Sequence, residues 1–398
     1  MTAAMLGAAL TLTAVVSGRG AEKPGGTTTG GPYKVGYVTD LSGIARDSYA
    51  PVLEGFQLYF KQLNAEGGID GHPVQVVVRD DQSTADKSVA AAIDFATREK
   101  VSGIFGLSLS STIQAVFEAM KTYGIPVVTG FSAIDTTLPP ANEVGYATGN
   151  IAQAVGVTGA RFAQGLAHSG KVVCVTINTP GGIGACKKNS GTLRAAGYQT
   201  DEVAFPIATA DYSPVATGVV AKNPDFVVAH FGSSFHLRMI MALRAAGYKG
   251  PYLAADWGTS EGFLKRAAAT AGVEEGIYMF SRYVVADSEV PGAARLREAA
   301  KKFGAQIELQ TPHVHGWALA RVAHEALAKC GFPCDGNGLN AALKELKVDM
   351  HGITGGPVEF FPDDHYGTTY WRLFRFDGKE DKFVAASDWM KLPSTDLK

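Results

Sequence analysis

The sequence predicts an α/β fold with two doubly wound parallel-sheet domains, and three observations carry this prediction. The chain has 398 residues, which is too long for one ordinary hydrophobic core. Short apolar runs alternate with stretches of helical periodicity, which is typical of a parallel sheet covered on both faces. The alternation begins at Tyr33 and restarts after Asn150. We therefore expect two domains of similar construction.

The first part of the chain is expected to contain three strand–helix units. Tyr33–Val38 and Val74–Val78 are short apolar runs that predict buried strands. Helices are predicted over residues 52–63 and 83–100, because apolar side chains recur there at intervals of three and four. A third strand is predicted at Val101–Gly106.

The loop after this third strand concentrates hydroxyl groups. Four of its side chains carry one, namely Ser108, Ser110, Ser111 and Thr112. Such a loop places hydroxyls and unpaired backbone amides at a helix N-terminus, at the edge of the sheet where α/β proteins bind ligands. The pattern predicts a carboxylate-binding loop. Simple N-capping is the alternative, although one hydroxyl would suffice for a cap.

The hydroxyl-rich loop leads into another helix and strand. Apolar residues fall at i, i+3, i+4 and i+7 over residues 113–120, which predicts an amphipathic helix. Ile125–Thr129 is predicted as a strand, and Gly130–Ala133 as the loop after it.

The second half repeats this architecture and then departs from it. Its strands are predicted at Lys171–Ile177, Phe226–Phe231, Tyr252–Ala255 and Ile277–Tyr283. Its helices are predicted over residues 155–167, 187–196, 237–244, 292–303 and 314–330, with Thr179–Gly184 as a Gly-rich loop. Residues 358–361 and 370–376 predict antiparallel strands, and breaks near 280 and 355 suggest that the chain crosses between domains more than once.

The N-terminus predicts export. Residues 1–17 are apolar and uncharged, so we interpret residues 1–20 as a signal peptide and residues 21–32 as a flexible tether. Val15–Gly18 resembles the approach to a bacterial lipoprotein cleavage site, but Arg19 stands in place of the lipidated cysteine. The expected location is the periplasm or the cell surface.

Charge and cysteine content narrow the function further. A formal net charge of −2 gives no electrostatic footprint for nucleic acid, so we expect no nucleic-acid partner. Export permits disulfides, and the four cysteines suggest Cys330 with Cys334 and, with weaker support, Cys174 with Cys186. Ligation of a metal by four thiols is the alternative, but the paired C-x₂-C spacing is absent.

Several segments, in this order and spacing, resemble bacterial solute-binding proteins of the leucine/isoleucine/valine-binding type, the type I periplasmic binding proteins that serve ABC importers. The resemblance runs from about Tyr33 to the C-terminus. It rests on Val35–Gly43, Leu63–Gly71, Arg79–Ser83, Ile104–Ser111, Tyr123–Ala133, the repeated LRAAGY and Gly355–Asp363.

The resemblance implies two α/β lobes that are joined by a three-strand hinge and close over a small ligand. Crossovers would fall near Thr148, Phe280 and Gly356. Lobe 1 would comprise residues 33–148 and 282–355, and lobe 2 residues 149–281 and 356–398. The implied partners are a small-molecule ligand and an ABC permease in the membrane, and we expect a monomer.

The resemblance also assigns ligand-binding residues. Ser110 and Ser111 would hold the carboxylate of the ligand, and the loop from Phe131 to Ala133 would supply a carbonyl to its ammonium group. Asp256, which follows a predicted strand of the other lobe, would complete the ammonium site. Its alternative role is an N-cap for the helix that begins near residue 260.

This sequence departs from the family pattern at the ammonium end. Ala133 stands where relatives commonly have Thr, and Asp256 is one methylene shorter than the usual Glu. Trp257 offers a flat apolar wall, while the positions near Gly182 and Gly232, where relatives place Tyr, are small. A branched-chain amino acid, a bulkier and aromatic carboxylate, and an amide therefore stay open as ligands.

No catalytic motif supports an enzyme. The sequence has no G-x-S-x-G, Walker loop, H-E-x-x-H or G-x-G-x-x-G after a strand, and we expect neither cofactor nor metal. The predicted function is the extracytoplasmic solute-binding component of an ABC importer. The alternatives are a ligand-sensing receptor lobe of the same fold and an exported enzyme.

Overall fold

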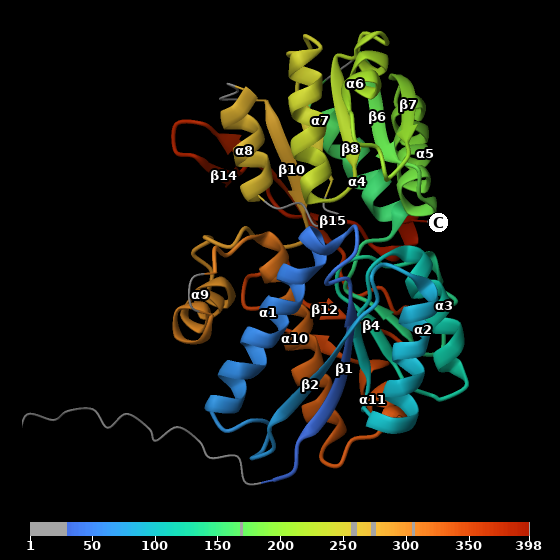
Figure 1. Cartoon of the computed structure of the whole chain (residues 1–398), viewed down its shortest axis with the longest axis vertical. Coiled ribbons are helices and arrows are strands. Elements are labelled where there is room, and N and C mark those ends of the chain that lie inside the picture. The colour runs from blue at the N-terminus through green and yellow to red at the C-terminus, as the bar shows by residue number, and fades with distance from the viewer. Residues whose placement is uncertain (1–29, 168–169, 256–260, 272–275, 305–306, 398) are drawn as a thin grey trace, which may run out of the picture.

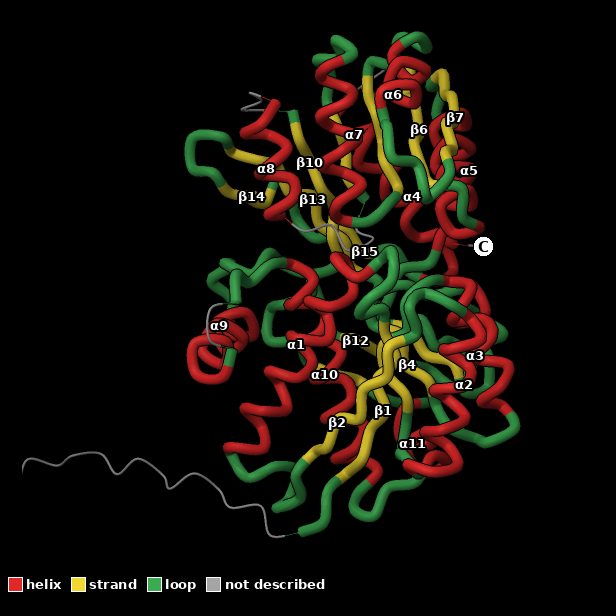
Figure 2. Tube along the Cα trace, viewed as in Figure 1, coloured by secondary structure: helices red, strands yellow, loops and turns green. Residues whose placement is uncertain are grey.

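A computed structural model describes residues 30–167, 170–255, 261–271, 276–304 and 307–397. Two α/β lobes are stacked along the long axis of the molecule, and strands run through the middle of each (Figures 1 and 2). We call them the lower and upper lobes, as they stand in Figure 1. The predicted fold class is confirmed.

The lower lobe is built on a five-stranded, entirely parallel sheet in the order β2-β1-β3-β4-β5. Its strands are β1 (Tyr33–Thr39), β2 (Val74–Asp80), β3 (Ile104–Gly106), β4 (Val127–Thr129) and β5 (Gly145–Ala147). Its helices are α1 (Arg46–Ala65), α2 (Ala85–Asp94), α3 (Ser110–Lys121), α9 (Pro291–Phe303), α10 (Thr311–Cys330) and α11 (Gly336–Leu343). The apolar positions that predicted α3 are fully buried, at Ile113, Val116, Phe117 and Met120.

The upper lobe has a mixed sheet in the order β14-β13-β10-β9-β8-β6-β7, with β15 paired to β13. The parallel strands are β6 (Lys171–Ile177), β7 (Gln199–Phe205), β8 (Phe226–His230), β9 (Tyr252–Ala254) and β10 (Ile277–Ser281). The antiparallel strands are β13 (Tyr370–Asp377), β14 (Lys382–Ala385) and β15 (Met390–Lys391). The helices are α4 (Ala152–Leu166), α5 (Pro180–Ala195), α6 (Ser213–Val220), α7 (Ser233–Ala245) and α8 (Glu261–Ala271).

Helix α5 begins earlier than the sequence predicted. Thr179 is its N-cap and accepts a hydrogen bond from the Gly182 N–H at 3.2 Å, and Pro180 occupies the first turn. The predicted Gly-rich loop is therefore the cap and first turn of a helix. Cap and proline outweigh the poor helix propensity of the glycines.

Three passages of the chain between the lobes converge on the carbonyl of Thr148. This carbonyl accepts hydrogen bonds from Tyr283 Oη at 3.1 Å, from Thr368 Oγ1 at 3.3 Å and from the Arg282 guanidinium. The third passage lies further along than Gly356, because β12 (Val358–Glu359) pairs with β11 (Lys347–Val348) and Val358 packs in the lower core. The assignment of whole residue ranges to the two lobes stays a prediction.

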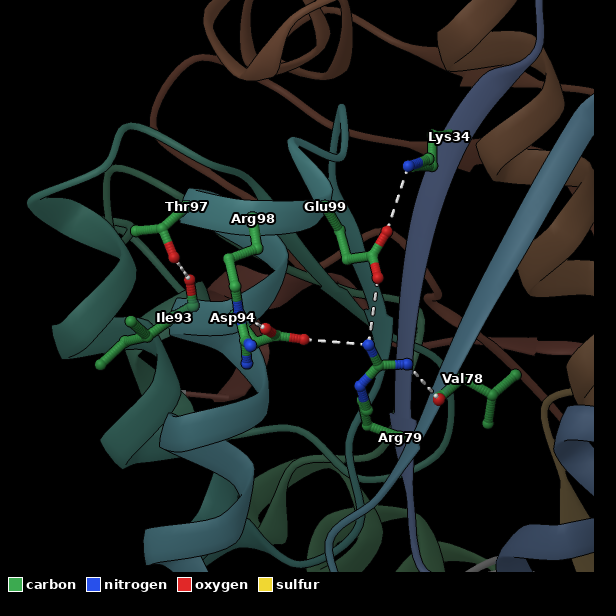
Figure 3. A network of polar contacts seen from close by, with 8 residues as sticks. All are labelled: Lys34, Val78, Arg79, Ile93, Asp94, Thr97, Arg98 and Glu99. Carbon is green, nitrogen blue, oxygen red and sulfur yellow. Dashed lines mark hydrogen bonds and ion pairs between the residues drawn. The ribbon is translucent and has the colours of Figure 1, made fainter.

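A network of ion pairs joins β1 and β2 to the π-helical turn Phe95–Glu99 that follows α2 (Figure 3). Arg79 lies 2.9 Å from Asp94 and 3.1 Å from Glu99, and Lys34 lies 3.1 Å from the other oxygen of Glu99. The hydrogen bond from Lys34 holds the pKa of Glu99 below its ordinary value.

Candidate functional site

The carboxyl ends of the parallel strands of both lobes face one cavity of about 90 Å³. Its lower wall consists of Ala45, Ser48, Tyr49, Leu109, Ser110, Ser111 and Ser132. Its upper wall consists of Ile177, Thr179, Pro180, Gly182, Ile207, His230, Phe231, Gly232 and Phe235. Helices α1, α3, α5 and α7 begin at or next to these residues, so the positive ends of four helix dipoles meet at the cavity.

The two serines that were predicted to hold a carboxylate line this cavity. Ser110 and Ser111 are the first two residues of α3, and the N-cap residue is Leu109, which makes no side-chain capping bond. The capping alternative therefore does not account for these hydroxyls. Of the other two hydroxyls in the loop, Ser108 bonds to Asp81 and Thr112 bonds to the carbonyl of Leu109.

Two buried aspartates brace the loops of the lower wall. Asp81 accepts hydrogen bonds from the Ser83 N–H at 2.9 Å and from the Ser88 and Ser108 hydroxyls at 2.9 and 2.8 Å. Burial raises the pKa of Asp81, against the opposing effect of these bonds. Asp40 accepts from the Ala45 N–H at 2.8 Å, next to the start of α1. Asp81 therefore fixes the serine loop through Ser108 and helix α2 through Ser88.

The loop after β4 contributes differently from the prediction. Ser132 lines the cavity and its Oγ lies 2.9 Å from Tyr49 Oη, whereas Phe131 and Ala133 are not among the residues that line it. Phe131 packs against Tyr49, and its carbonyl accepts a hydrogen bond from the Asn150 N–H at 2.8 Å. That bond engages the carbonyl that was expected to meet an ammonium group.

Ala133 lines a neighbouring groove of about 460 Å³. The groove adjoins the cavity, because Ser110, Ser111 and Pro180 line both. Asp135 lies in the groove and accepts a hydrogen bond from Gln153 of α4. Burial raises the pKa of Asp135.

Asp256 and Trp257, the two remaining predicted site residues, lie outside the described residues. Among the described residues that line the cavity, none carries a permanently charged side chain. The upper wall is instead formed mainly by Ile177, Ile207, Phe231 and Phe235.

Gly182 and Gly232, near which the resemblance placed a tyrosine in relatives, both line the cavity. A Cβ on Gly182 would lie 2.2 Å from Thr176 Oγ1 and 2.8 Å from the carbonyl of Ile177, so the first turn of α5 packs too closely for any side chain at this position. Packing thus favours a residue without a side chain at position 182.

His230 is a cavity residue that sequence reasoning missed. It is the last residue of β8, its side chain is 1% exposed, and neither ring nitrogen has a hydrogen-bond partner among the described residues. Burial lowers its pKa to about 3, which keeps the imidazole neutral at physiological pH. The available signal was one polar residue at the end of the apolar run FVVAH.

Both disulfides considered from the sequence are present, Cys174–Cys186 and Cys330–Cys334. The sulfur atoms of the first and a ring nitrogen of His230 lie within 4.8 Å of one another. Because these two sulfurs are bonded to each other, they offer no thiolates to a metal ion. Within the part of the chain that the structure describes, no helix combines the length and apolar character that a membrane crossing requires.

A cavity enclosed between two hinged α/β lobes, with helix N-termini directed at it, defines the chain as a two-lobed binding protein. The family model for periplasmic binding proteins matches residues 32–381. The chain belongs to this family, in agreement with the resemblance found in the sequence.

Solved structures share this fold at low sequence identity. The chain is 21% identical to a fatty acid ABC transporter substrate-binding protein from Thermomonospora curvata, with 94% of this chain and 95% of that chain covered and a TM-score of 0.78. A solute-binding protein from R. palustris in complex with 4-hydroxybenzoate is 21% identical, with 92% and 98% covered and a TM-score of 0.79.

A branched-chain amino acid ABC transporter protein from Thermus thermophilus with bound valine is 18% identical, with 93% and 98% covered and a TM-score of 0.81. These similarities establish the fold and leave the solute open. A search of curated protein sequences found no match to the chain.

Proposed function

We propose that this protein is the extracytoplasmic solute-binding component of an ABC importer and that it closes its lobes over a small organic carboxylate. The proposal of a carboxylate rests on the position of Ser110 and Ser111, which line the cavity at the N-terminus of α3, where no side chain caps the helix. A buried carboxylate needs several hydrogen-bond donors. Two hydroxyls and the free amides of the first helical turn supply them without a buried Lys or Arg.

The described part of the upper wall is mainly apolar, so the part of the solute that contacts it is proposed to be uncharged. A branched-chain amino acid requires an acid for its ammonium group, and Asp256 is the residue that we propose for that role. An aromatic acid or an amide requires none. The neighbouring structures with bound valine and with 4-hydroxybenzoate support the amino-acid and the aromatic-acid classes, and the fatty acid transporter protein adds an aliphatic acid.

The size of the cavity limits the solute. A volume of about 90 Å³ is smaller than the roughly 150 Å³ of an apolar cavity that holds benzene. A compact aliphatic acid fits this closed arrangement, and an aromatic acid requires the lobes to stand slightly further apart. The adjoining groove beside Ser110 and Ser111 is the space into which we propose that a longer solute extends.

We propose that the protein delivers the bound solute for transport and does not convert it chemically. The relatives are ABC transporter proteins, and the leader at residues 1–20 is consistent with an exported partner of a membrane permease. We propose a monomer with no enzymatic activity. Deleting the gene should abolish uptake of the solute into cells, whereas a receptor lobe would leave uptake intact and alter only a response.

The carboxylate site is tested by replacing both serines. Ser110→Ala with Ser111→Ala should weaken binding of the best solute from a thermal-shift screen of carboxylates by about a hundredfold, because two hydrogen bonds to a charged group are lost. Isothermal titration calorimetry measures the change. Thr122→Ala, an exposed hydroxyl at the opposite end of α3, is the matched control and should leave the affinity unchanged. Unaltered affinity in the double variant would refute the proposed site.

A further inference from the structure

Among the described residues that line the groove beside the cavity, only Asp135 has a charged side chain. Asp135 follows strand β4 of the lower sheet, whereas Gln153 and Gly184 on the other side of the groove belong to α4 and α5 of the upper lobe. Asp135 is exposed, so a molecule in the groove can reach it. Because Ser110 and Ser111 line both spaces, the groove begins at the proposed carboxylate site.

The carboxylate of Asp135 is held on one side and open on the other. Gln153 Nε2 donates a hydrogen bond to Asp135 Oδ2. Within the described parts of the chain, Oδ1 has no hydrogen-bond partner, and no Lys, Arg or His forms an ion pair with this acid. Although the residue is exposed, the walls of the groove displace water from its carboxylate and raise its pKa, against the opposing effect of the Gln153 bond. The acid therefore lacks a counter-ion.

The chemistry of Asp135 selects the group that completes it. A partly dehydrated carboxylate is stabilised by a cation that also donates a hydrogen bond to its open oxygen. A primary ammonium group does both, and it is charged at neutral pH. A hydroxyl group would donate without neutralising the charge, and a second carboxylate would be repelled. Lys187 and Lys188 line an outer groove that also includes Asp135, so a dianion is the competing class of solute.

We propose that Asp135 binds the ammonium group of an ω-amino acid, a solute whose amine lies at the end remote from its carboxylate. This inference rests on the proposed function, because it assumes that the carboxylate lies at Ser110 and Ser111. The solute then has its carboxylate at the N-terminus of α3 and its amine in the groove. Asp135 is thus assigned a different amine from the α-ammonium group proposed for Asp256.

Two matched pairs of acids test the inference by titration calorimetry with the full chain. The pairs are butanoate with 4-aminobutanoate, and hexanoate with 6-aminohexanoate, which differ in reach. In at least one pair the amino acid should bind about tenfold more tightly to the wild type, the effect of one charge-assisted hydrogen bond in a partly exposed position. Asp135→Asn keeps an oxygen for Gln153 and should reduce this ratio to less than about twofold while the plain acid still binds. Added salt should reduce the wild-type ratio as well.

Further measurements separate recognition of the amine from a general effect of charge. Asp47→Asn removes an exposed acid in the first turn of α1 that is not among the described residues lining the cavity or the groove, so it should leave the ratio unchanged. Asp135→Glu keeps the charge and should retain a preference for at least one of the two amino acids. 2-Aminobutanoate carries its amine beside the carboxylate, and Asp135→Asn should change its affinity by less than about twofold.

The possible outcomes are distinct. If the plain acids bind and neither amino acid gains, or if Asp135→Asn keeps the full preference, the role of Asp135 is refuted while the proposed function stands. Equal losses for 2-aminobutanoate and the ω-amino acids in Asp135→Asn, or tighter binding of glutarate than of either ω-amino acid, would refute it too. The same holds if the wider carboxylate screen finds a solute but neither ω-amino acid binds. If no carboxylate binds at all, the proposed function is refuted, and this inference with it.

Discussion

The lower wall of the cavity is polar and braced by buried charges, whereas the described upper wall is apolar and holds one unpaired neutral imidazole. In the lower lobe, Asp81 fixes the serine loop through Ser108, and Asp40 fixes the start of α1. In the upper lobe, the buried ring of His230 lies beside the Cys174–Cys186 disulfide and near Gly159 of α4. We propose that the lower wall receives the charged end of a solute and that the upper wall contacts the remaining part of it.

The largest effect is expected when the hydrogen bonds that brace the lower wall are removed. Asp81→Ala removes the acceptor of three hydrogen bonds, two of which come from the buried hydroxyls of Ser88 and Ser108. We expect the free energy of unfolding to fall by about 3 kcal/mol, and the affinity for carboxylates to fall as well because Ser110 and Ser111 lose their support. Urea denaturation followed by fluorescence measures the first effect, and calorimetry the second.

The matched control for this variant is Asp86→Ala, which removes an exposed acid from the first turn of α2. It should change the free energy of unfolding by less than about 1 kcal/mol, since only a helix-dipole interaction is lost. Equal effects of the two substitutions would show that Asp81 does not brace the wall.

The second expected effect is a pH dependence of stability that arises from the buried histidine of the upper lobe. The pKa of His230 is about 3 in the folded chain and about 6.5 in the unfolded chain, so the unfolded state binds the additional proton first as the pH falls. A depressed folded pKa contributes stability that is present above pH 6.5 and is lost progressively toward pH 3. Between pH 7 and pH 5, His230 alone should lower the free energy of unfolding by about 2 kcal/mol.

Denaturation of the wild type and of His230→Phe at both pH values measures this contribution as a difference. His236, whose pKa burial also lowers to about 3, should contribute a similar loss, and His236→Phe provides a second estimate. Parallel pH dependence in the wild type and in both variants would mean that these rings are not buried in neutral form.

The contrast between the walls also explains what the sequence could reveal. The lower-wall serines were predictable because their position depends on a local rule: a strand, a hydroxyl-rich loop and an amphipathic helix place them at the carboxyl edge of a parallel sheet. Most of the alternating strands and helices were predictable for the same reason, but β5, β7 and α6 were not predicted. The start of α5 was misplaced because glycine content was given more weight than the Thr179 cap.

The remaining features depend on contacts between residues far apart in the chain. The Phe131 carbonyl is engaged by Asn150, which no local pattern indicates. The third passage between the lobes depends on the pairing of β11 with β12. The environment of His230 depends on the disulfide and on α4, which lie next to its ring. An apolar strand with a polar last residue is compatible with many environments.

The smallest expected effect concerns charges that lie away from both walls. Arg79 pairs with Asp94 and Glu99, but its side chain is 38% exposed (Figure 3). When Arg79 is removed, Asp94 still pairs with Arg98, and Glu99 still pairs with Lys34. No member of this network is among the described residues that line the cavity. Exposed ion pairs contribute little because water and salt screen them. Arg79→Ala should therefore lower the free energy of unfolding by less than about 1 kcal/mol and leave solute affinity unchanged. Urea denaturation and calorimetry on the same preparation check both statements. A loss of affinity in this variant would show that charges outside the cavity also influence solute binding. The effect of the buried aspartates on affinity could then not be attributed only to the loops that they contact.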